Sequence, residues 1–267
     1  MSPFLLNQST GGRRAPLDRL ATRPSGVYAL RRMLSSWSGQ CINVRRSSDN
    51  ATADIGFNPA GLLDTATLLS FVGANTGQIT AWYDQSGNGA HLTQATLAYQ
   101  PTIVTAGVVR QVNGHASPYF GAGANSKLLV AAASIKVGSV GAVHAATTVG
   151  NFADWGCVWG GVNNYIYLAH VSGSTNINAQ RSDLVYASVT VNGISTSSVA
   201  PINTLKTMFA IYQAQTTTEG SNWGVGGGWD SVEGYIPEAV VFPGLVSDAD
   251  RRMVERNQQV FFSIAGS

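Results

Sequence analysis

The stretch WYDQSGNGAH, residues 82–91, joins an apolar strand to a compact polar turn. Glycine allows the backbone to adopt positive φ, and an aspartate at the start of a turn can accept hydrogen bonds from backbone amides. We therefore predict a structural turn built from Asp84, Ser86, Gly87, Asn88 and Gly89. The alternation of Asp84, Ser86 and Asn88 also fits a calcium loop, but a single carboxylate disfavours it. We predict neither a metal nor a cofactor.

Outward from this turn, short apolar segments are separated by Gly, Asn and Ser, and no long helix interrupts them. This pattern is typical of an all-β sandwich or jelly roll. A further strand is predicted from the alternation of Ile42 and Val44 with polar residues. The other predicted strands are residues 78–83, 101–104, 108–112, 127–131, 140–145, 165–170, 184–191, 208–212, 223–227 and 235–241.

Three helices are predicted at the two ends of this β-rich region. Apolar residues at helical spacing predict a short helix between Ser25 and Gly39. A second helix is expected from Asp64 to Val72, with Asp64 as its cap. A third is expected near Asp248 to Gln259, because Ser247 and the acids that follow it resemble a capping box.

The composition predicts one principal domain with a neutral, hydroxyl-rich surface. The chain has 267 residues, of which 11% are charged and 30 are glycine. All-β domains commonly reach this size undivided. We divide the chain into an extended basic arm, residues 1–24, and a single jelly-roll domain, residues 25–267.

Positive charge is concentrated near the N-terminus. Residues 1–46 carry a net charge of about +7, and the rest of the chain about −5. Such an arm can dock on an acidic protein surface or a phosphate-rich lipopolysaccharide, or it can simply be solvated. Nucleic acid is not expected, because aromatic residues do not alternate with the arginines. The docking candidates are Arg13, Arg14, Arg19 and Arg23.

Targeting signals and cysteine chemistry give little support for a secreted protein. The N-terminal stretch has no apolar core of a signal peptide, and no segment is long enough to insert into a membrane. Cys41 and Cys157 match no zinc or redox spacing. We expect two free thiols made in a reducing cytoplasm, with a bridge between them as the alternative.

Three segments resemble the catalytic domain of fungal α-L-arabinofuranosidase B. They are GVYALRRMLSSWSGQCINVRRSSDNATADIGF (26–57), LDTATLLSFVG (63–73) and WYDQSGNGAHLTQAT (82–96). The likeness is closer still to domains of this kind in tailed-bacteriophage virion proteins. It implies a concanavalin A-like or laminin G-like jelly roll.

The resemblance also implies a sugar pocket closed by two adjacent cysteines, and two catalytic carboxylates. Gly156 stands where the first of these cysteines is expected, so the clamp cannot form. Asp230 aligns loosely with the general acid/base, whereas no glutamate precedes Glu219 and Asp183 is better explained as a surface ion pair. A retaining glycosidase needs two placed carboxyl groups. Asp230 being the sole weak candidate, we expect no catalytic site and no enzyme.

Aromatic residues are the remaining candidates for ligand binding, because exposed indoles stack on sugar rings. The glycan-binding candidates are Trp155, Trp159, Trp223 and Trp229. The alternative for each is that it fills the core of the sandwich.

Together these features predict a bacteriophage structural protein on the virion surface, assembled in the host cytoplasm. It would be a decoration, collar or fibre component that docks on other virion proteins through its arm and forms a homo-oligomer. The first alternative is a lectin-like carbohydrate-binding receptor or adhesion module of a tail fibre, recognising host surface glycan. The second alternative is an active α-L-arabinofuranosidase. We expect neither nucleic acid nor membrane insertion.

Overall fold

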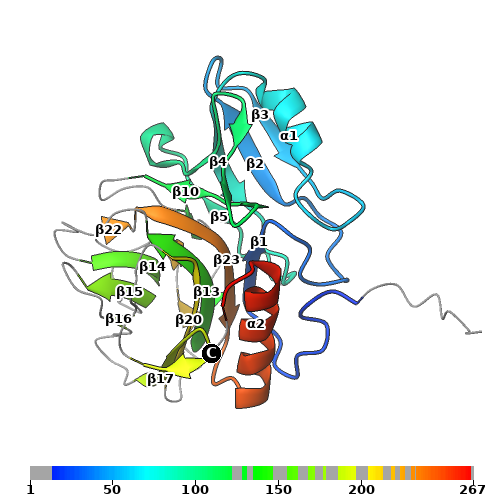
Figure 1. Cartoon of the computed structure of the whole chain (residues 1–267). Coiled ribbons are helices and arrows are strands. Elements are labelled where there is room, and N and C mark those ends of the chain that lie inside the picture. The colour runs from blue at the N-terminus through cyan, green and yellow to red at the C-terminus, as the bar shows by residue number, and fades with distance from the viewer. Residues whose placement is uncertain are drawn as a thin grey trace, which may run out of the picture.

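The computed structural model of this chain describes residues 14–121, 128–130, 135–146, 155–161, 168–171, 177–178, 186–196, 204–212, 218–219, 223–225, 230–231 and 233–265. Strands dominate these ranges, and mostly antiparallel pairing joins most of the strands into one large sheet. The predicted all-β class is confirmed. Figure 1 shows a layer with β2 (Ile42–Arg46), β3 (Thr52–Ile55), β4 (Gly77–Trp82) and α1 (Thr65–Val72). This layer is set beside a second, curved layer that contains β13 (Ser139–Ala146), β14 (Trp155–Gly161), β15 (Leu168–Val171) and β17 (Tyr186–Val191).

The first layer is built from β2 (Ile42–Arg46), β3 (Thr52–Ile55), β4 (Gly77–Trp82) and β6 (Thr102–Thr105). β2 pairs antiparallel with β3 and β4, and β4 pairs with β6. The alternating residues of β2 therefore form a strand, as predicted, and the predicted strands 78–83 and 101–104 are confirmed within a residue or two.

Helix α1 (Thr65–Val72) covers this layer and confirms the second predicted helix (Figure 1). The Asp64 carboxylate caps it by accepting hydrogen bonds from the backbone N–H of Thr67 at 3.1 Å and the Thr67 hydroxyl at 2.7 Å. Leu68 and Val72 are fully buried. The helix ends at Gly73, where φ is +61°.

The helix predicted between Ser25 and Gly39 is wrong. Instead, β1 (Gly26–Ala29) pairs antiparallel with β23 (Gly234–Phe242), in register from Gly26 opposite Val241 to Ala29 opposite Glu238. Every residue of β1 is buried. Pairing and burial with a partner far along the chain therefore outweigh the helical spacing of the apolar residues.

The second layer is organised around β23. This strand pairs with β13 (Ser139–Ala146), β13 pairs with β19 (Lys206–Tyr212), and β19 pairs with β17 (Tyr186–Val191). These four strands confirm the predicted strands 235–241, 140–145, 208–212 and 184–191. β23 also pairs with β1 and with β10 (Tyr119–Phe120), and β10 pairs with β6 of the first layer, so β23 joins the two layers.

The remaining elements are mostly short. The predicted strand 108–112 divides at Arg110 into β7 and β8, which belong to different sheets. The elements are β5 (Leu92–Thr93), η1 (Leu97–Tyr99), β7 (Val108–Val109), β8 (Gln111–Val112), β9 (His115–Ala116), β10 (Tyr119–Phe120), β11 (Leu128–Val130), β12 (Ile135–Lys136), β14 (Trp155–Gly161), β15 (Leu168–Val171), β16 (Ile177–Asn178), β18 (Ile194–Ser195), β20 (Thr218–Glu219), β21 (Trp223–Val225) and β22 (Asp230–Ser231).

Helix α2 (Asp248–Phe261) confirms the third predicted helix and packs against β13 and β19. The Ser247 hydroxyl accepts a hydrogen bond from the backbone N–H of Asp250 at 3.2 Å, as a capping residue does. Val254 is buried in an apolar cluster between the helix and the sheet. In Figure 1 the helix, in red, lies beside β1 and β23.

Residues 14–24, which the sequence assigned to an extended arm, pack against the domain near α2. Leu17 and Leu20 are buried in the same apolar cluster as Val254. The Asp250 carboxylate accepts hydrogen bonds from the backbone N–H groups of Ala21 at 3.1 Å and Thr22 at 2.8 Å.

A fully buried aromatic cluster joins the two layers at their centre. The Tyr28 ring of β1 stacks on Trp159 of β14, with centroids 5.6 Å apart, and meets Trp82 of β4 edge-to-face at 6.3 Å. None of the three side chains is exposed. Aromatic pairs of this kind add to the stability that burial alone provides.

Candidate functional site

The residues that the sequence linked to sugar chemistry meet on adjacent strands around β14. This strand pairs antiparallel with β15 and β21 and parallel with β22. The register sets Gly161 opposite Trp223 and Gly156 opposite Asp230. Two segments about 70 positions apart in the sequence are thereby placed side by side.

Asp230, the candidate acid, begins β22 directly opposite Gly156, and Ser231 stands opposite Cys157. Neighbouring strands lie roughly 4.8 Å apart, so the backbone of Asp230 borders the position where the resemblance expected a cysteine pair. Asp154, which precedes β14 in the sequence, and Asp183 lie outside the described residues.

The four candidate tryptophans have different positions. Trp155 begins β14, whereas Trp223 stands opposite Gly161 at the other end of that strand, so the register does not bring these two tryptophans together. Trp159 is fully buried against Tyr28 and packs the core rather than offering a face to a sugar. Trp229 lies outside the described residues.

The 82–91 turn is fixed by the buried carboxylate of Asp84. Its oxygens accept hydrogen bonds from the backbone N–H groups of Val27 at 2.9 Å, Ser86 at 2.8 Å and Ala90 at 3.2 Å. The Ser86 hydroxyl donates a fourth bond at 2.6 Å. Gly87 adopts φ of +87°, and Gly89 likewise has positive φ. These contacts give Asp84 a structural role, tying β1 to the turn.

Gln85 and Asn88 extend this network. The Gln85 side chain, only 1% exposed, accepts a hydrogen bond from the N–H of Met33 and donates to the carbonyls of Ala29 and Arg31. The Asn88 amide donates to the carbonyl of Ser25 at 3.1 Å. Gln85 is not among the residues predicted from sequence, although a long amide side chain inside a turn of small residues is a signal of such a role.

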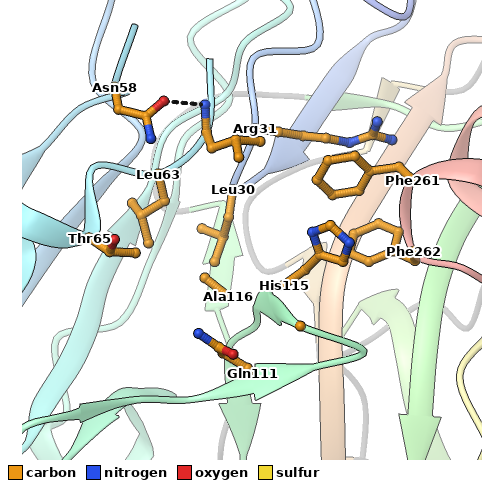
Figure 2. A pocket seen from close by; sticks show the side chains of 12 residues that line it. Leu30, Arg31, Asn58, Leu63, Thr65, Gln111, His115, Ala116, Phe261 and Phe262 are labelled. Atoms are coloured by element: carbon orange, nitrogen blue, oxygen red, sulfur yellow. Dashed lines mark hydrogen bonds between the residues drawn. The ribbon is translucent and has the colours of Figure 1, made fainter. Parts of the chain in front are cut away.

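A pocket of about 200 Å³ lies between the first layer and the end of α2 (Figure 2). His115, Phe261 and Phe262 form one side in this view, and Leu63 and Thr65 form the other. The volume is below the roughly 300 Å³ at which pockets for drug-sized ligands begin. None of the residues proposed from sequence lines it.

The charge beside this pocket is neutralised within the fold. The Arg31 guanidinium forms two hydrogen bonds to the Glu238 carboxylate, at 2.8 and 3.2 Å, and both side chains are buried. The same guanidinium lies 4.0 Å from the centre of the Phe261 ring. Burial lowers the pKa of His115, and the nearby Arg31 adds to this effect.

Three of the four docking candidates, Arg14, Arg19 and Arg23, are exposed, and Arg13 lies outside the described residues. Cys41 is a free, buried thiol, and burial raises its pKa. In the described ranges, no three His, Cys, Asp or Glu side chains gather closely enough to hold a metal ion. Neither helix in those ranges is long and apolar enough to cross a membrane.

Comparison with known proteins relates the N-terminal half to a glycosidase family. Residues 24–123 match the sequence model described as "Alpha-L-arabinofuranosidase B, catalytic". Over 66 residues the chain is 48% identical to a probable alpha-L-arabinofuranosidase B of Aspergillus fumigatus. This alignment covers 24% of this chain and 13% of that protein. An alpha-L-arabinofuranosidase of Hypocrea jecorina is 42% identical over 65 residues, with the same coverage.

Solved structures extend the likeness of fold to most of the chain. An arabinofuranosidase complexed with arabinofuranosyl-alpha-1,2-xylobiose aligns with a TM-score of 0.56 and 21% identity. A mutant GH54 α-L-arabinofuranosidase soaked with 4-nitrophenyl α-L-arabinofuranoside aligns with a TM-score of 0.57 and 22% identity. Each alignment covers 91% of this chain and 64% of the solved one.

These matches correct the function expected from the sequence. The expectation of a bacteriophage decoration, collar or tail-fibre protein without enzymatic activity is wrong, because the matched relatives and solved structures are α-L-arabinofuranosidases. The chain resembles the catalytic domain of α-L-arabinofuranosidase B.

Proposed function

We propose that this chain is a glycoside hydrolase domain that acts on α-L-arabinofuranosides, and that its sandwich is a concanavalin-like jelly roll. The observation that carries the proposal is the match of residues 24–123 to an arabinofuranosidase catalytic domain. The alignment of 91% of the chain with solved arabinofuranosidases supports a common fold beyond that segment.

The chemistry requires two carboxyl groups on either side of the glycosidic bond, roughly 5 to 5.5 Å apart in a retaining enzyme. We assign the acid/base role to Asp230, whose backbone lies next to β14. For the second carboxylate we choose Asp154, because it immediately precedes β14 in the sequence. A disulfide clamp has no part in this proposal, since Gly156 cannot supply a thiol.

The test is hydrolysis of 4-nitrophenyl α-L-arabinofuranoside by the full chain, measured as the 4-nitrophenolate that is released. Asp230→Asn and Asp154→Asn keep the size of each side chain but remove its ability to ionise. General acid/base catalysis contributes roughly 10²- to 10⁴-fold, so we expect kcat to fall by at least about a hundredfold in each variant.

Asp49→Asn is the matched control, because Asp49 is an exposed aspartate paired with Arg46 in the turn after β2. Its activity should equal that of the parent. Hydrolysis that survives in both Asp230→Asn and Asp154→Asn would overturn the assignment of these residues. Absence of hydrolysis by the parent, with or without binding of the glycoside, would overturn the proposed activity.

A further inference from the structure

Three half-buried aromatic side chains, Trp37, Tyr83 and His91, meet on the outer side of the 82–91 turn. The His91 ring lies 5.1 Å from Tyr83 at an interplanar angle of 88°, and 6.4 Å from Trp37 at 66°. In an edge-to-face pair, at least one ring keeps both faces clear of its partner. This arrangement therefore leaves aromatic surface available to a ligand.

A polar edge adjoins these rings. The exposed Asp54 carboxylate accepts hydrogen bonds through Oδ1 from the Tyr83 hydroxyl at 2.6 Å and from the Asn43 amide at 2.8 Å. Within the part of the chain that the structure describes, its second oxygen, Oδ2, is bonded to no donor. A hydroxylated ligand could donate to Oδ2 without breaking an existing bond.

The rings are held in place before any ligand arrives. The Trp37 indole N–H donates to the Gln40 carbonyl at 3.1 Å, and the ring lies so close to Gly39 that an added Cβ would stand 2.4 Å from it. His91 Nδ1 accepts a hydrogen bond from the backbone N–H of Asp84 at 3.0 Å. Because these side chains are already ordered, binding to them costs little conformational entropy.

We propose that Trp37, Tyr83, His91, Asp54 and Asn43, here named the aromatic patch, bind a neutral, pentose-rich polysaccharide. The apolar faces of sugar rings would pack on the aromatic side chains, and sugar hydroxyls would bond to Asp54 and Asn43. Asp54 is the charged member of the patch, so an acidic polysaccharide would meet like charge. The ligand is therefore neutral.

The patch lies on the same continuous sheet as β14. A row of residues, each paired with the next across neighbouring strands, connects the patch to β14. The row is Asn43, Ala81, Thr93, Leu129, Gly224 and Gly160. Measured along the curved sheet, this row spans five strand spacings of about 4.8 Å, or roughly 24 Å. On the proposed function, which this step assumes, one polymer chain that reached both places would bind more tightly than a single sugar unit.

The experiment measures binding of soluble debranched arabinan and arabinoxylan by affinity gel electrophoresis, with polygalacturonate as the acidic comparison. In Trp37→Ala we expect Kd for the neutral polymers to rise at least about tenfold, as for loss of an aromatic anchor. Tyr83→Phe keeps the ring and loses its bond to Asp54, so a smaller rise is expected. In both variants kcat/KM for 4-nitrophenyl α-L-arabinofuranoside should stay within about twofold of the parent.

Tyr235→Ala is the matched control, because Tyr235 is a half-buried tyrosine that pairs edge-to-face with Tyr119 on β10. It should bind the polymers as the parent does. Equal binding by parent and folded Trp37→Ala, or equal affinity for polygalacturonate, would overturn the proposal. Loss of polymer binding in Trp37→Ala supports the patch even if the parent hydrolyses no arabinofuranoside, so this result is separate from failure of the proposed activity.

Discussion

Asp84 shows how one side chain can determine a local fold. Its buried carboxylate satisfies three backbone N–H groups, one of which belongs to β1. The turn was predictable, because the positive φ of Gly87 and Gly89 and the capping tendency of aspartate are local properties. The contact of Trp37 with Gly39 was not, because the spacing of two residues does not reveal how closely a ring approaches the backbone.

We predict that Asp84→Ala lowers the free energy of unfolding by at least ~3 kcal/mol, because three backbone N–H groups, two of them in buried hydrogen bonds, lose their charged acceptor. Asp84→Asn retains one acceptor oxygen, so its free energy of unfolding should lie between those of Asp84→Ala and the parent. Urea unfolding at neutral pH measures both. Asp49→Ala, which removes only exposed hydrogen bonds and a surface ion pair with Arg46, should stay close to the parent's midpoint. If Asp84→Ala shared that midpoint, the turn would not be what holds β1.

Lys206 makes the free energy of unfolding depend on pH in the alkaline range. Burial lowers the pKa of its amine from 10.5 to about 8. Between these values the unfolded chain holds a proton that the folded chain has released, so this group makes stability increase as pH rises from about 8 towards 10.5. Below pH 8 the amine is charged in both states, and the cost of burying the charge is fully present.

Lys206→Met should remove this pH dependence. We expect the unfolding free energy of the parent to rise relative to the variant between pH 8 and 10.5, by at most ~3 kcal/mol. Taking the difference cancels the tyrosines that both chains share, including Tyr83, whose pKa burial raises to about 12. Chemical denaturation of both chains at several pH values measures this difference in unfolding free energy. A constant difference across the window would contradict the assignment.

At the scale of elements, the predictions succeeded where the signal is local. Helix α2 carries its own cap and α1 its own capping aspartate, so both could be located from sequence. Strand β1 could not, because the spacing of its apolar residues fits a helix equally well and its partner, β23, lies near the other end of the chain. The adjacency of β14 and β22 could not be predicted either, because these strands also lie far apart in the sequence.

Asp250 links two elements, because its carboxylate in the first turn of α2 binds the backbone of Ala21 and Thr22. We expect Asp250→Ala to release residues 14–24 and speed tryptic cleavage after Arg14 and Arg19 by roughly tenfold or more, since two charge-assisted bonds are lost. Mass spectrometry of timed digests identifies the cuts.

Asp248→Ala is the control for this digestion, because Asp248 is an exposed acid in the same turn of α2. Its cleavage pattern should match that of the parent. Equal cleavage rates in Asp250→Ala and the parent would show that Leu17 and Leu20, rather than the carboxylate, hold the segment.

For the whole molecule, the class of fold was predictable and the arrangement of the candidate site was not. Turn residues and short apolar segments indicated an all-β chain. Asp230 and Gly156 were each noted in the sequence, but only the register of β14 with β22 sets them opposite one another. Register between distant strands depends on the assembled sheet, so no local pattern encodes it.

The position of β23 has a consequence for how the chain is made. It pairs with β1 from Gly26 opposite Val241, about 215 positions apart, and it also pairs with β10 and β13. A ribosome must therefore synthesise everything from β1 to β23 before the second layer can close and join the first, and until then strand edges stay open to wrong partners. Folding should be slow and depend on chaperones, and a fragment that ends before β23 should aggregate.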